Sequence, residues 1–466
     1  MNRVLRALDA LILAGESFEG LFPSLLDRRT GAMLSRMPPP IAGQRNGDRS
    51  HLGCNLIHDE ATLKTLYALA AALGRPDYAE AADRYLRRFA THCTDTASGL
   101  FPWGEHSFWH LGEDRIGNSY DFIGDGQQRE VTHDHLRQAP LWLWDKLWHF
   151  NPRCIERFAE GLNFHWQGET REEYFRHARI GKREYPKPDL RSCDFPRHSG
   201  FYILDWSYAW KRTGRGDFLQ QIHQMMNYWW DKRDSRGLLL IESRSPRNAT
   251  HFHGINSPAQ TLSLAASLLE SSAFLEESLP ETAATMRNRA QGYIEGFFNA
   301  PHNVEKGIFV STSRQDDNTP TVTMPIWGSQ YGLWPASYVG LICLCVYRLS
   351  RDRRLLDWAC AVAERYCREA FPGGASIPAM DAGLGLGLVV DLYDITGEVR
   401  WLEGASCLAE KLTETYLDAA LPRGASGIDW YESQMGPGFL LHALARTALL
   451  ADNRSSCVLQ ADYTAR

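Results

Sequence analysis

The sequence has no uncharged apolar stretch long enough to cross a bilayer, and none of its ten cysteines forms a CxxC pair. With a formal net charge of −6, it also lacks the surplus of Lys and Arg that attracts nucleic acid or an anionic membrane. We therefore expect neither nucleic acid nor a membrane among its partners. Several cysteines fall inside apolar helical runs, which indicates buried, reduced thiols.

The N-terminus lacks the small-residue cleavage site of a secretion signal. Its apolar run, MNRVLRALDALILAGESFEG, is interrupted by Asp9, and Glu16 and Glu19 follow where such a site would stand. We interpret this stretch as the first helix of the folded protein. Together with the reduced thiols, it predicts a cytoplasmic protein.

Aromatic residues are abundant, with 15 Trp, 18 Tyr and 20 Phe. Aromatic faces stack on the C–H faces of sugar rings, so this surplus points weakly to a carbohydrate ligand. A wide helical core filled by large side chains explains the same surplus equally well.

A pair of amphipathic helices separated by a short polar break recurs along the chain. The breaks fall at 74–77, 214–217, 350–353 and 396–398, and a fainter pair covers 260–279 and 281–298. Their Gly and Asp residues end one helix and cap the next. Strand signals are few, the best being RGLLLIESR (236–244) and KGIFVSTSR (306–314). One helix pair cannot bury its own apolar face, so the pairs must stack on one another.

The loops between these pairs decide between an open superhelix and a closed ring. An open solenoid keeps a nearly fixed repeat length, whereas the connections here vary and the long ones are rich in Gly, Pro, His, Arg and Trp. We therefore predict an all-α fold, an (α/α) toroid of about six to seven helix pairs with long loops lining a cleft at one end. We expect a single domain, 1–466, with 99–195 as its main elaboration.

Arg197 and His198 stand directly before an aromatic-rich helix in PRHSGFYILDWSYAW. The positive potential at a helix start disfavours imidazolium, so His198 would stay neutral near pH 7, as a general base must. The alternative is a histidine that caps the helix or packs under Trp206.

Two His-x-His pairs raise the possibility of a metal site. His133 with His135, and His251 with His253, could each supply half of a tetrad. Their flanking residues supply no clear carboxylate or Cys ligand set, so we predict no metal and no other cofactor.

The stretch FPWGEH supports a competing hypothesis. Trp103 beside Glu105 could form a sugar platform and a general acid, as in a glycoside hydrolase or a sugar epimerase. A hydrolase also needs a second carboxylate, for which the candidates are Asp114, Asp121, Asp125, Asp134 and Asp194.

RHSGFYILDWSYAW and SRSPRNATHFHGINSPAQTLSLAASL together resemble helical-toroid polysaccharide lyases that act on alginate, glucuronan and related polyuronates. His198 matches the catalytic His of that family and Arg247 its substrate-stabilising Arg. Arg197 stands where the family usually has Asn. The family's catalytic Tyr falls close to His253, so the resemblance implies His253, His251 or Tyr331 as the second proton-transfer group.

The resemblance implies β-elimination on an acidic oligo- or polysaccharide, with His198 as base, His253 or Tyr331 as acid, and an arginine neutralising the uronate carboxylate. We expect substrate contacts from Arg197, Arg247, His251, Glu105, His106, Trp103, His133 and His135. A non-catalytic helical-repeat binding protein is a third hypothesis, and the oligomeric state stays open.

Overall fold

Each break predicted from the sequence ends a helix through a residue in the left-handed region. Gly74, Gly214 and Gly397 have φ values of 66°, 69° and 70°, and Arg351 takes the same role at 62°. A positive φ directs the chain out of the helix, and the next helix starts within two to three residues. The predicted helix pairs are therefore confirmed.

The computed structural model describes residues 1–168, 173–187, 194–243, 254–329 and 333–452. The α-helices are α1 (Asn2–Gly15), α2 (Leu56–Leu73), α3 (Pro76–Arg88), α4 (Leu141–Phe150), α5 (Pro152–Gly161), α6 (Pro196–Thr213), α7 (Gly216–Trp230), α8 (Pro258–Leu275), α9 (Pro280–Phe298), α10 (Ala336–Ser350), α11 (Arg353–Arg368), α12 (Ala379–Thr396), α13 (Val399–Tyr416) and α14 (Pro437–Ala451).

The strands are short. They are β1 (Leu25–Asp27), β2 (Gly53–Cys54), β3 (Ser107–His110), β4 (Arg115–Asn118), β5 (Thr132–His133), β6 (Ala178–Arg179), β7 (Ile255–Asn256), β8 (Val310–Arg314), β9 (Pro320–Thr323) and β10 (Trp430–Glu432). The predicted strand at 306–314 is confirmed by β8. The one predicted at 236–244 is wrong, because its described part makes only a single bridge, between Leu240 and Asn256.

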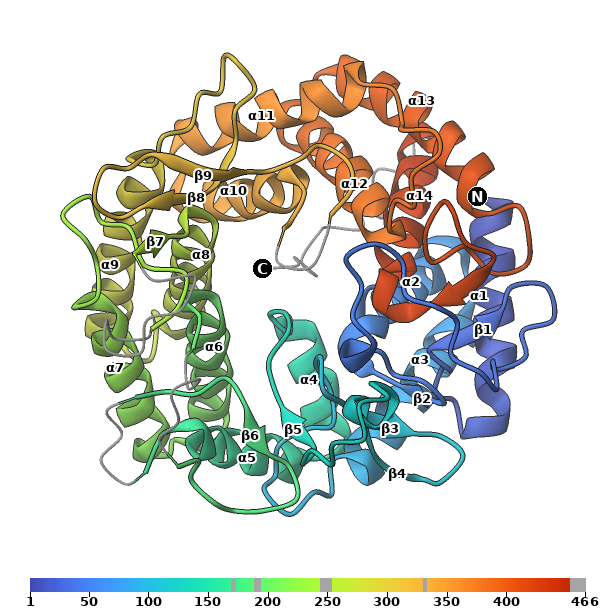
Figure 1. Cartoon of the computed structure of the whole chain (residues 1–466), viewed down its shortest axis with the longest axis horizontal. Coiled ribbons are helices and arrows are strands. Elements are labelled where there is room, and N and C mark those ends of the chain that lie inside the picture. The colour runs from blue at the N-terminus through green and yellow to red at the C-terminus, as the bar shows by residue number, and fades with distance from the viewer. Residues whose placement is uncertain (169–172, 188–193, 244–253, 330–332, 453–466) are drawn as a thin grey trace.

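The helices form a closed ring, an (α/α) toroid, as predicted (Figure 1). Helices α2, α4, α6, α8, α10, α12 and α14 face the centre, and their partners lie outside them. The inner helix α12 is buried on every side from Ala379 to Leu392, whereas the outer helix α13 buries only four residues. An inner helix packs against neighbours on all sides, which explains why its sequence lacks an amphipathic pattern.

Inner helices α12 and α14 approach so closely that a side chain is excluded between them. A Cβ built on Gly383 would lie 2.4 Å from the backbone nitrogen of Leu440. Glycine therefore lets the two backbones meet at this point of the inner wall.

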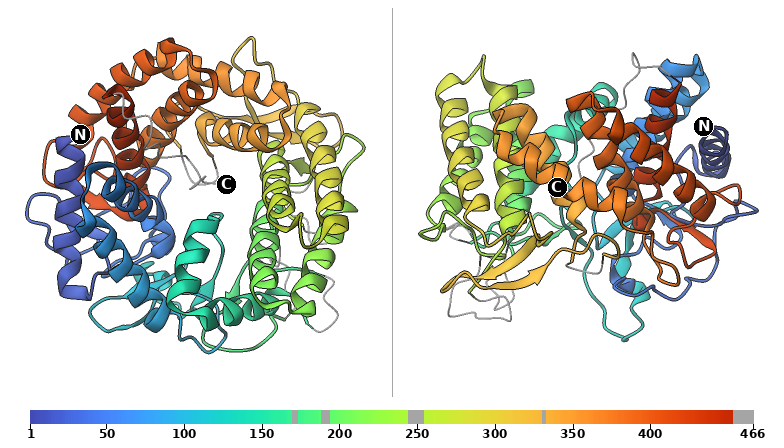
Figure 2. Two further views of the ribbon diagram at one scale, coloured as in Figure 1. Left: turned by 180° about the vertical axis from the view of Figure 1, so that it is seen from behind. Right: turned by 90° about the horizontal axis from the view of Figure 1, so that it is seen from above.

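The ring is closed by segments from its two ends. Strand β1 pairs antiparallel with β10, with Leu25 opposite Glu432, and α14 packs against α2. The other strands form the sheets β2-β3-β4, β5-β6 and β7-β8-β9. These strands and the long loops gather at one end of the ring (Figure 2).

The N-terminal stretch forms helix α1, as expected, and buries Val4, Ala7, Leu8 and Leu11 against the ring. Across the described residues, every helix is too short or too polar to span a membrane. The segment 99–195 contributes α4, α5 and strands β3 to β6.

Candidate functional site

A cleft of about 1110 Å³ opens at the end of the ring where the loops gather. Five arginines and several aromatic side chains line it. The lining residues used below are Arg45, Asp48, His58, Glu105, Tyr120, Arg129, Arg137, Arg176, His177, Phe195, Arg197, Gln260, Ser263, Trp334, Tyr338 and Met380.

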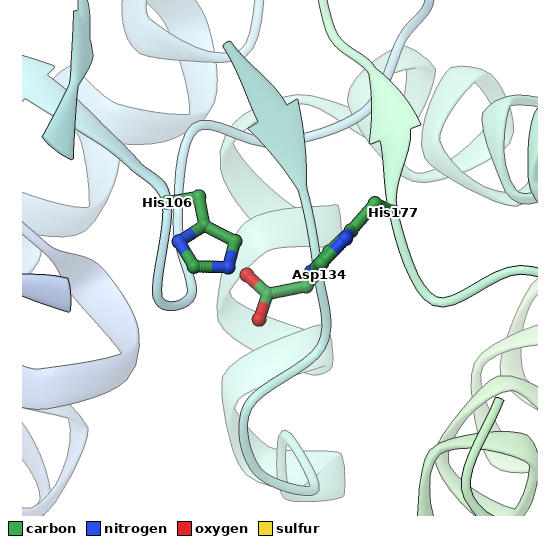
Figure 3. A group of neighbouring side chains, drawn as sticks. All are labelled: His106, Asp134 and His177. Carbon is green, nitrogen blue, oxygen red and sulfur yellow. The ribbon is translucent and has the colours of Figure 1, made fainter. Parts of the chain in front are cut away.

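Next to the cleft lie His106, Asp134 and His177, whose side chains point toward one another (Figure 3). His177 lines the cleft, whereas His106 and Asp134 are each 1% exposed and lie behind its lining. His106 precedes β3, Asp134 follows β5 and His177 precedes β6. Since β5 and β6 pair antiparallel with His133 opposite Ala178, Asp134 and His177 are next to each other one step beyond the pair. One ligand atom from each of the three residues lies within 4.8 Å of the others.

The hydrogen bonds of this triad leave lone pairs available for a cation. His106 Nδ1 lies 3.1 Å from the carbonyl oxygen of Gly47, so Nδ1 carries the proton and Nε2 the lone pair. His177 Nε2 is buried and has no hydrogen-bond partner among the residues that the structure describes. Two imidazoles and a carboxylate suit a divalent transition metal, so the residues fit such an ion.

Two further carboxylates, Asp48 and Glu105, adjoin the triad. Asp48, Glu105 and His106 form a second group whose ligand atoms lie within 4.8 Å of one another. Burial raises the pKa of Asp48 to about 8, and the charge of Glu105 adds to that shift. Burial and Glu105 likewise raise the pKa of Asp134 to about 7. Crowded carboxylates ionise reluctantly without a positive charge among them, which again favours a cation here.

Glu105 itself behaves differently. Burial acts to raise the pKa of its carboxyl, but the positive charges of Arg176, Arg197 and Arg45 outweigh burial and lower it. Arg176 Nη1 lies 3.9 Å and His106 Nε2 3.8 Å from Glu105 Oε2. Burial lowers the pKa of His106 to about 4, so the imidazole is neutral, as a metal ligand must be.

Arginines and aromatic rings face this acidic group. The guanidinium of Arg176 lies over Phe195, at 5.0 Å, and that of Arg197 over Trp334, at 5.5 Å. Aromatic faces hold a guanidinium in place while leaving its N–H edge available to a carboxylate.

His198 lies beneath the cleft and is not among its lining residues. It is 1% exposed, its Nδ1 is 3.4 Å from Asp194 Oδ1, and both ring nitrogens are without a hydrogen-bond partner among the described residues. Burial and then Arg197 hold the pKa of His198 well below its usual range. The imidazole is therefore neutral, as expected, and its role as base stays a prediction.

Three other residues expected to contact substrate are wholly buried. Trp103 Nε1 donates to His133 Nε2 at 3.0 Å, and His135 Nε2 lies 2.7 Å from Asp205 Oδ2. Trp103, His133 and His135 are all 0% exposed and lie behind the cleft wall. The His-x-His pair faces the core because side chains alternate along an extended segment, which turns the intervening Asp134 toward His106 and His177.

The structure thus brings together Arg197, Glu105 and His106 of the residues expected from the sequence. Arg247, His251, His253 and Tyr331 lie outside the described residues. Arg45, Asp48, Arg176 and His177 are not predicted from the sequence, which offers Asp134 only as one of five candidates for a hydrolase carboxylate. One sequence signal points to Arg176 and His177, because the dipeptide Arg-His occurs both at 176–177 and at 197–198. Only the copy at 197–198 stands on a predicted amphipathic helix.

A family model described as periplasmic pectate lyase matches residues 36–188. That segment is about a third of the chain and contains the triad, Asp48, Glu105 and Arg176. No curated protein matches the sequence.

Solved structures resemble the chain with TM-scores below 0.5. A D-mannose isomerase is 11% identical, covering 78% of this chain and 96% of its own, with a TM-score of 0.49. A sugar epimerase from a ruminal bacterium is 10% identical, covering 97% of this chain and 98% of its own, with a TM-score of 0.45. An unsaturated glucuronyl hydrolase specific for heparin is 12% identical, covering 84% of this chain and 98% of its own, with a TM-score of 0.44. We draw no functional conclusion from these similarities.

The family match corrects the expected cytoplasmic location, because the matching family is described as periplasmic. The expectation of a cytoplasmic location relied in part on the reduced cysteines. Cys54, Cys93, Cys154 and Cys343 are free and buried, and burial raises their pKa values. A thiol shielded in this way stays reduced in either compartment, so it does not report on location. The match supports an enzyme that acts on carbohydrate; it does not specify alginate or glucuronan.

Proposed function

We propose that this protein is a polysaccharide lyase that cleaves a polyuronate by β-elimination, with pectate, a polygalacturonate, as the first substrate to test. The observation that carries the proposal is that the segment similar to pectate lyases holds the whole acidic and imidazole group, of which Asp48, Glu105 and His177 line the cleft. Arginines stand beside that group in the same cleft.

In β-elimination a base removes the proton on C5, the bond from C4 to the glycosidic oxygen breaks, a C4=C5 double bond forms, and an acid protonates the departing oxygen. The C5 proton is weakly acidic unless the adjacent carboxylate is neutralised. Arg176 and Arg197 line the cleft and present N–H groups that pair with a carboxylate. They would hold the uronate and neutralise it.

His106, Asp134 and His177 would hold a divalent cation when one is bound, and that cation would supply further positive charge near the uronate. His106 is oriented for this by Gly47, and Asp134 Oδ1 is held by the backbone N–H of Glu105 at 2.8 Å. A proton acceptor must reach C5, so it must also line the cleft. Glu105, His58 and Tyr120 line it, whereas His198 does not.

Glycoside hydrolysis is the second candidate, favoured by the closeness of the Asp48 and Glu105 oxygens, within 4.8 Å. One assay separates the two functions. Incubation with polygalacturonate, alginate and glucuronan is followed by ultraviolet absorbance and by reducing ends. Rising absorbance from an unsaturated uronate supports a lyase. Reducing ends without absorbance would support the hydrolase and overturn the proposal.

A further inference from the structure

Arg137 is a buried arginine that has no carboxylate partner within 4.0 Å in the described part of the chain. It lies in the loop before α4, lines the cleft and is 4% exposed. Its guanidinium contacts a carbonyl, a thioether and a ring: Nη1 is 3.4 Å from Ile57 O, Nη2 is 3.5 Å from Met380 Sδ, and Phe439 lies at 4.8 Å. Its Nε has no hydrogen-bond partner, and it forms no salt bridge with any described residue.

Other buried arginines of the chain show what is missing. Arg446 pairs with Asp391 and Asp394, and Arg49 pairs with Glu432 at 2.6 Å. A buried charge without such a partner costs several kcal/mol. Glu60 attracts the Arg137 guanidinium, but burial outweighs that attraction and lowers the pKa of Arg137 to about 10. The arrangement is therefore complete only when an anion enters the cleft.

Other side chains of the cleft also have unused hydrogen-bonding capacity. Among the described residues, both ring nitrogens of His58, which is 2% exposed, have no hydrogen-bond partner, and neither do Gln260 Oε1 and Ser263 Oγ. All three line the cleft together with Arg137. They combine donors with acceptors, as a sugar bearing a carboxylate and hydroxyl groups requires.

The backbone adds to this electrostatic preference. His58, Gln260 and Ser263 lie in the first two turns of inner helices α2 and α8, and Arg197 lies in the first turn of α6. These inner helices therefore direct their N-termini, which carry partial positive charge, toward the cleft.

We propose that Arg137, with His58, Gln260 and Ser263, forms a second carboxylate-binding subsite. When the sugar that is cleaved lies at Arg176 and the His106–Asp134–His177 triad, this subsite binds a neighbouring uronate of the same polysaccharide. This inference rests on the proposed function. It implies that the enzyme recognises at least two adjacent uronates of its substrate, and that a single uronate would occupy only part of the cleft.

Arg137→Met tests the subsite, because methionine fills a similar space without charge. Calorimetric titration with digalacturonate and with galacturonate gives the affinities, and absorbance of the same samples records any cleavage. We expect the wild type to bind digalacturonate at least tenfold more tightly than galacturonate, and Arg137→Met to lose about 10- to 100-fold for digalacturonate. With polygalacturonate we expect KM to rise by a similar factor and kcat to change less than threefold.

Arg129→Met is the matched control. Arg129 lines the same cleft, but its guanidinium already pairs with Asp125. We expect its loss to change digalacturonate affinity less than threefold. Equal losses in the two variants would overturn the subsite, because they would show only a general effect of positive charge.

The thermal midpoint separates binding from folding. Removing an unpaired buried charge should leave the midpoint of Arg137→Met unchanged or raise it. If Arg137→Met no longer unfolds cooperatively, Arg137 is needed for folding, and Arg137→Lys, which keeps the charge, becomes the test. Arg137→Lys must then retain digalacturonate affinity within tenfold, and a larger loss would overturn the subsite. If no uronate yields unsaturated product, the proposed function fails, while Arg137-dependent binding of digalacturonate would still support the subsite.

Discussion

Trp103 Nε1 donates a hydrogen bond to His133 Nε2, and this contact fixes the protonation of two buried histidines. An indole N–H can only donate, so His133 Nε2 is the acceptor and His133 Nδ1 carries the proton. His133 Nδ1 lies 2.9 Å from His165 Nε2, so His165 in turn donates from Nδ1 to the carbonyl oxygen of Phe175, at 2.7 Å. Each hydrogen bond in this series therefore donates in the same direction, from Trp103 toward Phe175.

These hydrogen bonds join the three segments that carry His106, Asp134 and His177. Trp103 lies three residues before His106, His133 directly before Asp134, and Phe175 two residues before His177. We expect Trp103→Phe to leave His133 Nε2 without a donor, which costs about 1 to 3 kcal/mol of unfolding free energy. Urea unfolding measures the loss. Trp148→Phe is the control, since Trp148 lies on α4, is only partly buried and is away from these hydrogen bonds; equal losses would contradict the assignment.

The triad predicts that the protein binds a divalent cation. Titration of metal-free protein with Mn²⁺ should give a saturable signal, and His106→Ala or His177→Ala should weaken binding by at least 100-fold through loss of a ligand. His92→Ala is the matched control, since His92 is half-exposed and pairs with Asp114 away from the cleft. Binding that survives in both triad variants would place the cation elsewhere.

Arg176 and His198 can be ranked by activity. We expect Arg176→Ala to lower kcat/KM on the cleaved polyuronate by about 100-fold or more, because a carboxylate contact that strengthens in the transition state is lost. His198→Ala tests the base assigned from the sequence. A loss larger than that of Arg176→Ala would support His198 as base, and near-normal kcat with lowered stability would make it a core residue.

Asp59 predicts how stability changes with pH. Its Oδ2 accepts from Tyr85 Oη at 2.8 Å, and burial raises the pKa of Asp59 to about 8. The folded state keeps the proton that the unfolded chain releases near pH 4, so this group's contribution falls by about 1 kcal/mol per pH unit as pH rises from about 4 to about 8. Asp59→Asn, which is always neutral, should lose that part of the slope. Urea unfolding at pH 5 and pH 7.5 measures it; parallel slopes would contradict the assignment.

The ring was predictable because its information is local and repeated. Gly74, Gly214 and Gly397 mark helix ends directly in the sequence, and each helix pair shows its own apolar stripe. The site is harder to predict, since Asp134 and His177 meet only through the pairing of two-residue strands. Nothing periodic in the sequence indicates such a pairing. The His-x-His pair predicts a site at His133 and His135, whereas the structure places Asp134, between them, against His106 and His177.

The pairing of β1 with β10 determines when the active cleft can exist during synthesis. Leu25 is made before its partner Glu432, which follows some four hundred residues later. Arg49, beside the cleft loop that carries Asp48, also binds Glu432. The segment of Leu25 must therefore wait without this partner until the residues between them have been made. Loss of β10 would remove this pairing and the Glu432 partner of Arg49, and would leave the packing of α14 against α2 to close the ring.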